Sequence, residues 1–182
     1  MKVYVHLAEG FEEIEAITVV DVLRRAGVEA ETVSVTGEFS VTGAHGIPVT
    51  ADLLFEEADY DNCEMIVLPG GMPGTTNLGA HEGLVKQLEK FAEQNRWLAA
   101  ICAAPMVLGK AGLLKDRTAV IYPGMEAHLV EARVGKNPVE VDGKIITSKG
   151  PGTAMAFALT LVEVLKGASE ADALKRSMLL NL

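Results

Sequence analysis

Cys102, one of two cysteines in the chain, lies between a short apolar stretch and a predicted helix. Residues 97–101 are continuously apolar and of strand length, as expected of a parallel strand covered on both faces, and Pro105 suits the first turn of a helix. At such a turn the thiol would face backbone N–H groups and the positive end of the helix dipole, which favours the thiolate. Cys102 is therefore a candidate nucleophile on a sharp strand-to-helix turn. The alternative is a small core side chain without chemistry, the usual fate of a free cysteine.

A carboxyl partner for this thiol is expected in the acidic segment after the first predicted strand. Glu15 shares a helical stripe with Val19 and Val22, which directs it inward toward the sheet. A carboxyl desolvated beside a thiolate would have a raised pKa and could donate a hydrogen bond to sulfur. The alternative is an exposed helix carboxylate. Three neighbouring acids are expected to be solvated: Glu9, Glu12 and Glu13.

The turn that contains Gly70 and Gly71 follows another predicted strand and lets the backbone approach a ligand closely. Its spacing fits neither the Rossmann nor the P-loop pattern. A better use is an oxyanion site, in which the N–H groups of Gly71 and Ala103 face charge that develops near the sulfur. Glycines needed only for turn geometry are an equal alternative. Tyr122, at another strand end, is a possible pocket residue, although packing on the sheet is as reasonable.

The other titratable candidates do not gather around Cys102. Cys63 has acidic neighbours that disfavour the thiolate, and we expect it to be inert. No histidine follows the thiol, so a Cys-His protease is weakly supported. The two cysteines lack metal-ligand spacing, and no metal or other cofactor is predicted. The histidines are scattered along the chain: His6, His45, His81 and His128.

Composition limits the partners. The 182 residues are 49% hydrophobic and 23% charged, which predicts one globular domain over residues 1–182. A net charge of −9 repels phosphate backbones, so nucleic-acid binding is not expected. No apolar run is long enough to span a bilayer, and the first residues enter a strand pattern at once. We therefore expect a cytoplasmic protein that acts on a small molecule or a protein partner and does not bind membranes.

The elements that must position these side chains alternate between strands and helices. Strands are predicted over 2–7, 28–35, 65–68, 97–101 and 118–122, with hairpins at 39–49 and 139–147, the latter closed by a type I′ turn. Helices are predicted from 12 to 25, 82 to 95, 105 to 112, 125 to 133, 153 to 165 and 170 to 177. The apolar face of the first is assigned to Ile14, Ile17, Val20 and Leu23. This alternation indicates a doubly wound α/β sandwich with a mostly parallel sheet, helices on both faces and ligands at the carboxyl ends of the strands.

Four segments together resemble the ThiJ/PfpI superfamily: residues 8–16, 67–71, 100–105 and 147–153. The most similar branch is that of the parkinsonism-associated protein deglycase and its bacterial relatives. The resemblance implies a flavodoxin-like homodimer with an oxidation-prone Cys102, Glu15 as its partner carboxyl, and Gly71 and Ala103 as backbone donors. Protease members have histidine where Ala103 stands. Some glyoxalase-active relatives have histidine in place of Tyr122, which argues against a histidine base here.

Two hypotheses follow. The first is a glutathione-independent glyoxalase or protein deglycase that acts on small α-oxoaldehydes, with a Cys102 thiolate as nucleophile and Glu15 as proton shuttle. The second is an oxidative-stress sensor or chaperone-like protective protein whose Cys102 oxidises to the sulfinate, held by Glu15 and the same backbone donors.

Overall fold

One mostly parallel sheet forms the centre of the molecule. The computed structural model describes residues 1–180. The strands of the main sheet are β1 (Lys2–Leu7), β2 (Glu29–Ser34), β5 (Leu53–Leu54), β6 (Met65–Leu68), β7 (Trp97–Ile101), β10 (Val139–Asp142) and β11 (Ile145–Ser148). Their order in space is β10-β11-β7-β6-β1-β2-β5. Only β10, at one edge of this sheet, runs antiparallel to its neighbour.

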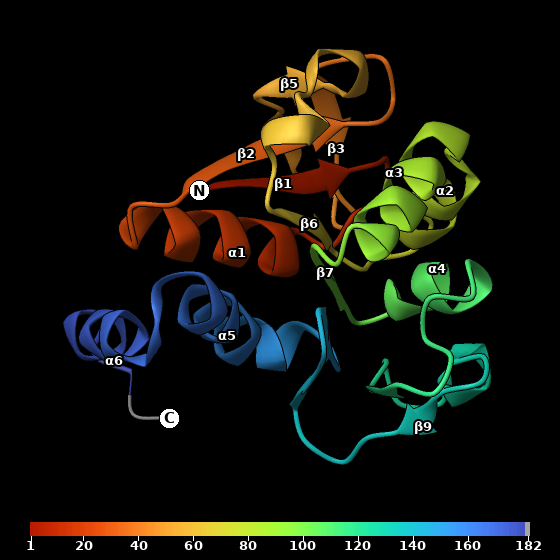
Figure 1. Cartoon of the computed structure of the whole chain (residues 1–182). Coiled ribbons are helices and arrows are strands. Elements are labelled where there is room, and N and C mark those ends of the chain that lie inside the picture. The colour runs from red at the N-terminus through yellow and green to blue at the C-terminus, as the bar shows by residue number, and fades with distance from the viewer. Residues whose placement is uncertain (181–182) are drawn as a thin grey trace.

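Helices cover both faces of the sheet (Figure 1). On one side α1 (Glu13–Arg25) packs against α5 (Ala154–Lys166), which packs against α6 (Ala168–Ser177). On the other side α2 (Gly74–Ala80) contacts both α3 (Glu82–Glu93) and α4 (Pro105–Lys110). The predicted doubly wound sandwich is thereby confirmed.

The alternation of side chains along β1 explains how one strand serves two layers. Val3, Val5 and Leu7 join the core cluster beneath α1 and α5, whereas Tyr4 joins the cluster beneath α3 and α4. Successive strand residues point to opposite faces, and both faces of this sheet are covered. A central strand must therefore be apolar in both directions.

Two smaller sheets lie outside the main one. The hairpin of β3 (Ser40–Thr42) and β4 (Pro48–Thr50) agrees with the prediction for residues 39–49. The predicted strand over 118–122 is much shorter: β8 (Thr118–Ala119) pairs only with β9 (Arg133–Val134). The prediction of a helix over 125–133 is wrong, because only a 3₁₀ turn forms there, at Glu126–His128. The 3₁₀ turn packs against α4, where a Cβ on Gly109 would lie 2.2 Å from the His128 oxygen, and the local pattern does not report that contact.

Two further predictions need correction. Ile14 and Ile17 are 56% and 42% exposed, so the buried face of α1 is rotated toward Ala16, Val19 and Leu23. Apolar residues surround most of this helix, and the sequence pattern alone did not fix which stripe faces inward. The turn between β10 and β11 has a positive φ at Gly143 but not at Lys144. This fits type II′ rather than type I′, which requires positive φ at both central residues.

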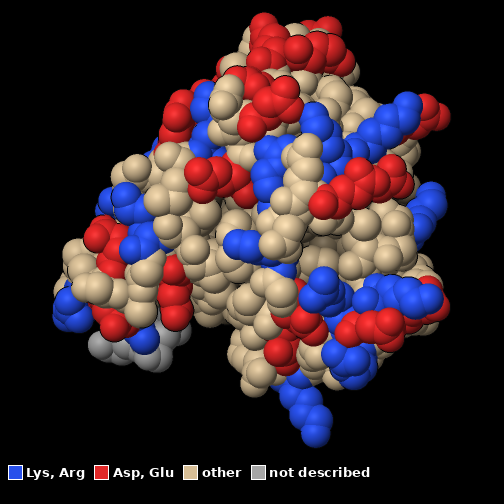
Figure 2. Space-filling view, in the orientation of Figure 1, with Lys and Arg blue, Asp and Glu red and all other residues tan. Residues whose placement is uncertain are grey.

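The surface carries both signs of charge. Exposed acids gather over the segment that follows β5, at the top of the space-filling view (Figure 2). None of the helices within residues 1–180 is long and apolar enough to cross a membrane.

Candidate active site

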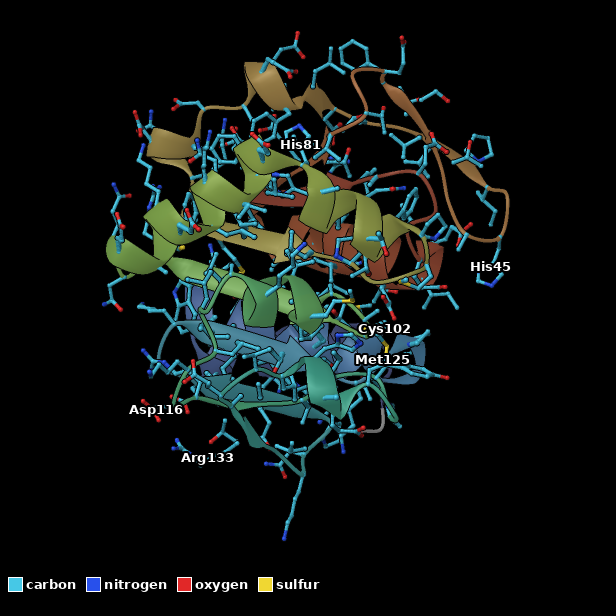
Figure 3. The ribbon with its side chains drawn as sticks, turned by 90° about the vertical axis from the view of Figure 1, so that its right-hand side faces the viewer. His45, His81, Cys102, Asp116, Met125 and Arg133 are labelled. Carbon is cyan, nitrogen blue, oxygen red and sulfur yellow. The ribbon has the colours of Figure 1, made fainter. Side chains whose placement is uncertain are left out.

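Cys102 occupies a strained turn between β7 and α4 (Figure 3). Its φ is +62°, a left-handed conformation that non-glycine residues rarely adopt and that is often found at functional sites. Two backbone hydrogen bonds hold it: the Cys102 N–H donates to the Ser148 oxygen (2.9 Å), and the Tyr122 N–H donates to the Cys102 oxygen (2.8 Å). The side chain is partly exposed. The predicted strand-to-helix turn is present, and the thiol is not sealed in the core.

Glu15 points inward from the first turn of α1, as the stripe pattern predicted. It is 0% exposed. The Gly70 N–H donates to its Oε2 at 2.7 Å, and Oε1 has no hydrogen-bond partner of ordinary geometry among the described residues. The carboxyl lies close enough to the Cys102 thiol for each group to shift the pKa of the other through a hydrogen bond. A buried carboxyl and a partly exposed thiol therefore form a pair.

The electrostatics of this pair differ from the sequence-based prediction for the thiol. Burial raises the pKa of Glu15 to about 7, while hydrogen bonds from Gly70 and Cys102 oppose that rise. Burial also raises the pKa of Cys102 to about 12, and the negative charge of Glu15 adds to it. The expected preference for a free thiolate is thus wrong, because burial of the thiol outweighs its backbone donors and the charge of Glu15 adds to the rise. Between the two groups, the site accommodates one negative charge.

Backbone N–H donors oppose the rise in the pKa of Cys102. The N–H groups of Gly71 and Ala103 lower the pKa of Cys102 through hydrogen bonds to its sulfur. These are the two donors that the sequence singled out. Any negative charge that develops at or beside the sulfur faces both of them.

Gly70 and Gly71 allow three strand ends to meet. A Cβ on Gly70 would lie 2.6 Å from the Cys102 Cβ and 2.7 Å from Glu15 Oε2, and one on Gly71 would lie 2.4 Å from the Glu12 nitrogen. The Glu12 N–H donates to the Gly70 oxygen at 2.9 Å. Glycine is required at both positions because a Cβ would collide with the neighbouring segments, and not only because of the turn geometry. The adjacent order β7-β6-β1 in the sheet brings these ends together.

Tyr122 borders the site through its backbone, and its side chain is 48% exposed. Its ring lies near Gly150, where an added Cβ would be 3.4 Å from Cδ2. About half of the side chain is thus open to solvent, and no hydrogen bond of its hydroxyl to Cys102 is found among residues 1–180.

The other titratable candidates lie outside the Cys102 pair. Cys63 is buried, and burial raises its pKa to about 11, in line with an inert thiol. His6 is fully buried against Tyr60. The expectation that Glu12 and Glu13 are solvated is wrong: they are 8% and 7% exposed because the β3–β4 hairpin covers them.

Sequence reasoning missed Ser148, whose carbonyl fixes the Cys102 backbone, and the contact between Glu13 and His45. The segment 147–153 was marked by the family resemblance, but not this role. Neither contact has a local signal, because each joins segments that are distant in the sequence.

Comparisons with known proteins support the fold described above. The sequence model of the DJ-1/PfpI family matches residues 1–164. The chain is 37% identical over 179 residues to DJ-1 homolog B of Arabidopsis thaliana, covering 98% of this chain but 41% of that protein, so it spans less than half of that relative. It is 33% identical to a deglycase of Pyrococcus abyssi, covering 91% of this chain and 100% of the relative. The structure of oxidized Toxoplasma gondii DJ-1 superposes with a TM-score of 0.96 at 37% identity, covering 100% and 99% of the two chains.

Proposed function

The chain belongs to the DJ-1/PfpI family, and on that premise we propose that it is a cysteine-dependent enzyme for small α-oxoaldehydes. The reaction would be of the glutathione-independent glyoxalase or protein deglycase type. One observation carries the proposal: the buried Glu15 carboxyl has one oxygen held by Gly70 and the other without an ordinary partner, beside the Cys102 thiol. A buried acceptor next to a nucleophile is positioned to take its proton.

The first step is addition of the thiol to the aldehyde. As the Cys102 sulfur bonds to the aldehyde carbon, its proton passes to the Glu15 carboxylate, and the C=O electron pair moves to oxygen. That oxyanion faces the N–H groups of Gly71 and Ala103. Glu15 returns the proton, which yields a neutral hemithioacetal. Because the carboxylate removes the proton during attack, the high pKa of the resting thiol does not prevent reaction.

The second step moves a proton between adjacent carbons. The Glu15 carboxylate removes the proton from the former aldehyde carbon, which gives an enediolate. The hydroxyl proton passes to the adjacent oxygen and Glu15 returns its proton to the neighbouring carbon, which leaves a thioester of a 2-hydroxy acid. Water then hydrolyses the thioester and regenerates the Cys102 thiol. The sum is α-oxoaldehyde plus water giving a 2-hydroxy acid, with no external oxidant or reductant.

The test is formation of lactate from methylglyoxal by the reduced protein without glutathione. We expect Cys102→Ser and Glu15→Gln to abolish turnover and Cys63→Ser to retain it, because Cys63 is buried elsewhere. Equal activity in Cys102→Ser and the unaltered protein, or no lactate from the unaltered protein, would contradict the proposal.

An oxidative-stress sensor is the second candidate. Its support is the difference in access between the thiols, because Cys102 is partly exposed and Cys63 is 1% exposed. One peroxide would convert the Cys102 thiol to sulfenic acid and water, and a second would give the sulfinate. Intact mass after graded peroxide should show a stable gain of two oxygens, located at Cys102 by peptide mapping. Equal oxidation of both cysteines would count against a sensor.

A homodimer and a cytoplasmic location complete the proposal. Ile14 and Ile17, three residues apart on α1, expose an apolar surface that a second copy could cover. Both cysteines are free, as fits a reducing compartment.

A further inference from the structure

Two acids and a histidine from distant segments meet at the start of α1. Glu12 and Glu13 belong to this helix start, and His45 lies in the loop between β3 and β4. Their potential ligand atoms all lie within 4.8 Å of one another. We propose that Glu12, Glu13 and His45 form a binding site for a divalent transition-metal ion of the Zn²⁺ type. This site is separate from the Cys102 pair and does not depend on the proposed reaction.

The spacing of the donor atoms suits such an ion. His45 Nδ1 lies 2.9 Å from Glu13 Oε2 and 3.5 Å from Glu12 Oε2. Around a tetrahedral Zn²⁺ with bonds of about 2.1 Å, neighbouring ligand atoms are about 3.4 Å apart. The two distances to His45 Nδ1 therefore lie within about half an ångström of that spacing, and the two carboxylates lie within 4.8 Å of each other. Imidazole nitrogen together with carboxylate oxygen is a donor set that Zn²⁺ accepts.

Glu12 supplies an independent indication that a cation is needed. Its side chain is 10% exposed, and within residues 1–180 its carboxylate accepts no hydrogen bond. Its one ionic contact is His45 Nδ1 at 3.5 Å, and that nitrogen is already bonded to Glu13. A carboxylate with little exposure to water is stabilised by a cation placed beside it. A metal ion would satisfy Glu12 and Glu13 together.

Glu13 is held in the orientation that such a site requires. Its Oε1 accepts the backbone N–H of His45 at 2.8 Å and that of Ile47 at 3.4 Å, which leaves Oε2 for the imidazole. Gly43 lets the hairpin lie directly on this carboxylate, since a Cβ there would be 2.3 Å from Oε1. Such support of ligands by neighbouring groups is typical of metal sites.

The hairpin is itself anchored to the start of the helix. The Gly10 N–H donates to the Thr42 oxygen, and the Ala44 N–H donates to the Phe11 oxygen, both at 2.8 Å. His45 thus reaches the acids from a fixed loop. Its side chain is 67% exposed and lies at the outer side of the molecule (Figure 3), which gives an ion a path from solvent and leaves room for a water ligand.

The experiment is titration of the full-length metal-free protein with Zn²⁺ by calorimetry. We expect one ion per chain, with affinity reduced at least about a hundredfold in His45→Ala and in Glu12→Gln, since loss of even a supporting group costs 10- to 100-fold. His128→Ala is the matched control, because His128 is also exposed, and it should bind as the unaltered protein does.

Cys102→Ser separates this site from the thiol pair and should retain Zn²⁺ affinity. Co²⁺ bound in place of Zn²⁺ should give d–d absorption without a thiolate charge-transfer band. Absence of binding, undiminished binding in both His45→Ala and Glu12→Gln, or loss of binding in Cys102→Ser would overturn the proposal. Because His45 is exposed, its alanine variant is expected to fold, and circular dichroism of both variants checks this.

Discussion

Replacing Glu15 with glutamine should make Cys102 alkylate faster while turnover is lost. The carboxylate raises the pKa of the thiol through its charge and its hydrogen bond, and glutamine removes the charge. The same change removes the group proposed to accept and return the proton. Reactivity toward a simple alkylating agent and catalytic turnover should therefore move in opposite directions.

The size of the effect follows from the contact between the two groups. A unit charge about 4 Å from the sulfur, at an effective dielectric constant of about 20, contributes about 4 kcal/mol. At 1.36 kcal/mol per pKa unit, about 3 units is the upper bound for the fall in the pKa of Cys102, and the actual fall is smaller because burial is the largest cause of the rise. The thiolate fraction at about pH 8 then increases by up to about a thousandfold, and the lower nucleophilicity of a less basic thiolate reduces the gain in rate to about thirtyfold.

The assay is the rate of alkylation by iodoacetamide, followed by intact mass in a Cys63→Ser background. The pKa of Glu15 is about 7, so the variant and its parent should differ above that pH and converge below it, where the carboxyl is protonated. An unchanged or slower rate in Glu15→Gln at high pH would refute the claim that this carboxylate holds the thiol protonated. A difference independent of pH would refute the assignment of the titration to Glu15.

Three other outcomes are expected. The pKa of Glu15 is raised in the folded state, from 4.5 to about 7, so the free energy of unfolding falls as the pH rises between these values. In urea unfolding, Glu15→Gln should therefore be more stable than its parent above pH 7, by up to about 3 kcal/mol, and equally stable at pH 4. Gly70→Ala should reduce kcat/KM for methylglyoxal about a hundredfold or more, because the new Cβ would displace Cys102 and Glu15, whereas Gly152→Ala, with no atom within 4 Å of its Cβ, should not. We expect a dimer for the unaltered chain and a monomer for Ile14→Lys in light scattering; a dimer that is unaffected by Ile14→Lys would exclude this face of α1 as the interface.

The sequence predicted the central strands because almost every position in them is buried. Residues 65–68 and 97–101 are apolar at every position and form β6 and β7 with those bounds. A strand covered on both sides has little freedom in composition, so its pattern is reliable. The turn at Cys102 followed from the end of one such strand and the proline that starts the next helix.

The sequence could not predict features that depend on docking between distant segments. Glu12 and Glu13 looked solvated because acids commonly begin helices, and only the hairpin, some thirty residues away, buries them. The thiol was expected to ionise because its own turn supplies N–H groups, whereas burial of the thiol raises its pKa and the charge of Glu15 adds to that rise. The sequence identified Glu15 as the partner, but it does not report how deeply the fold buries the thiol.

Three acids at the start of α1 meet different neighbours within one helical turn. Residues two apart on a helix lie on nearly opposite sides, so Glu13 and Glu15 face different neighbours. Glu15 receives the Gly70 N–H and faces the thiol, whereas Glu13 receives two N–H groups of the hairpin. Glu12, three residues before Glu15, lies between the two, and its charge adds a small rise to the pKa of Glu15. The proposed reaction and the proposed metal site therefore share a helix but no side chain, and each can fail without the other.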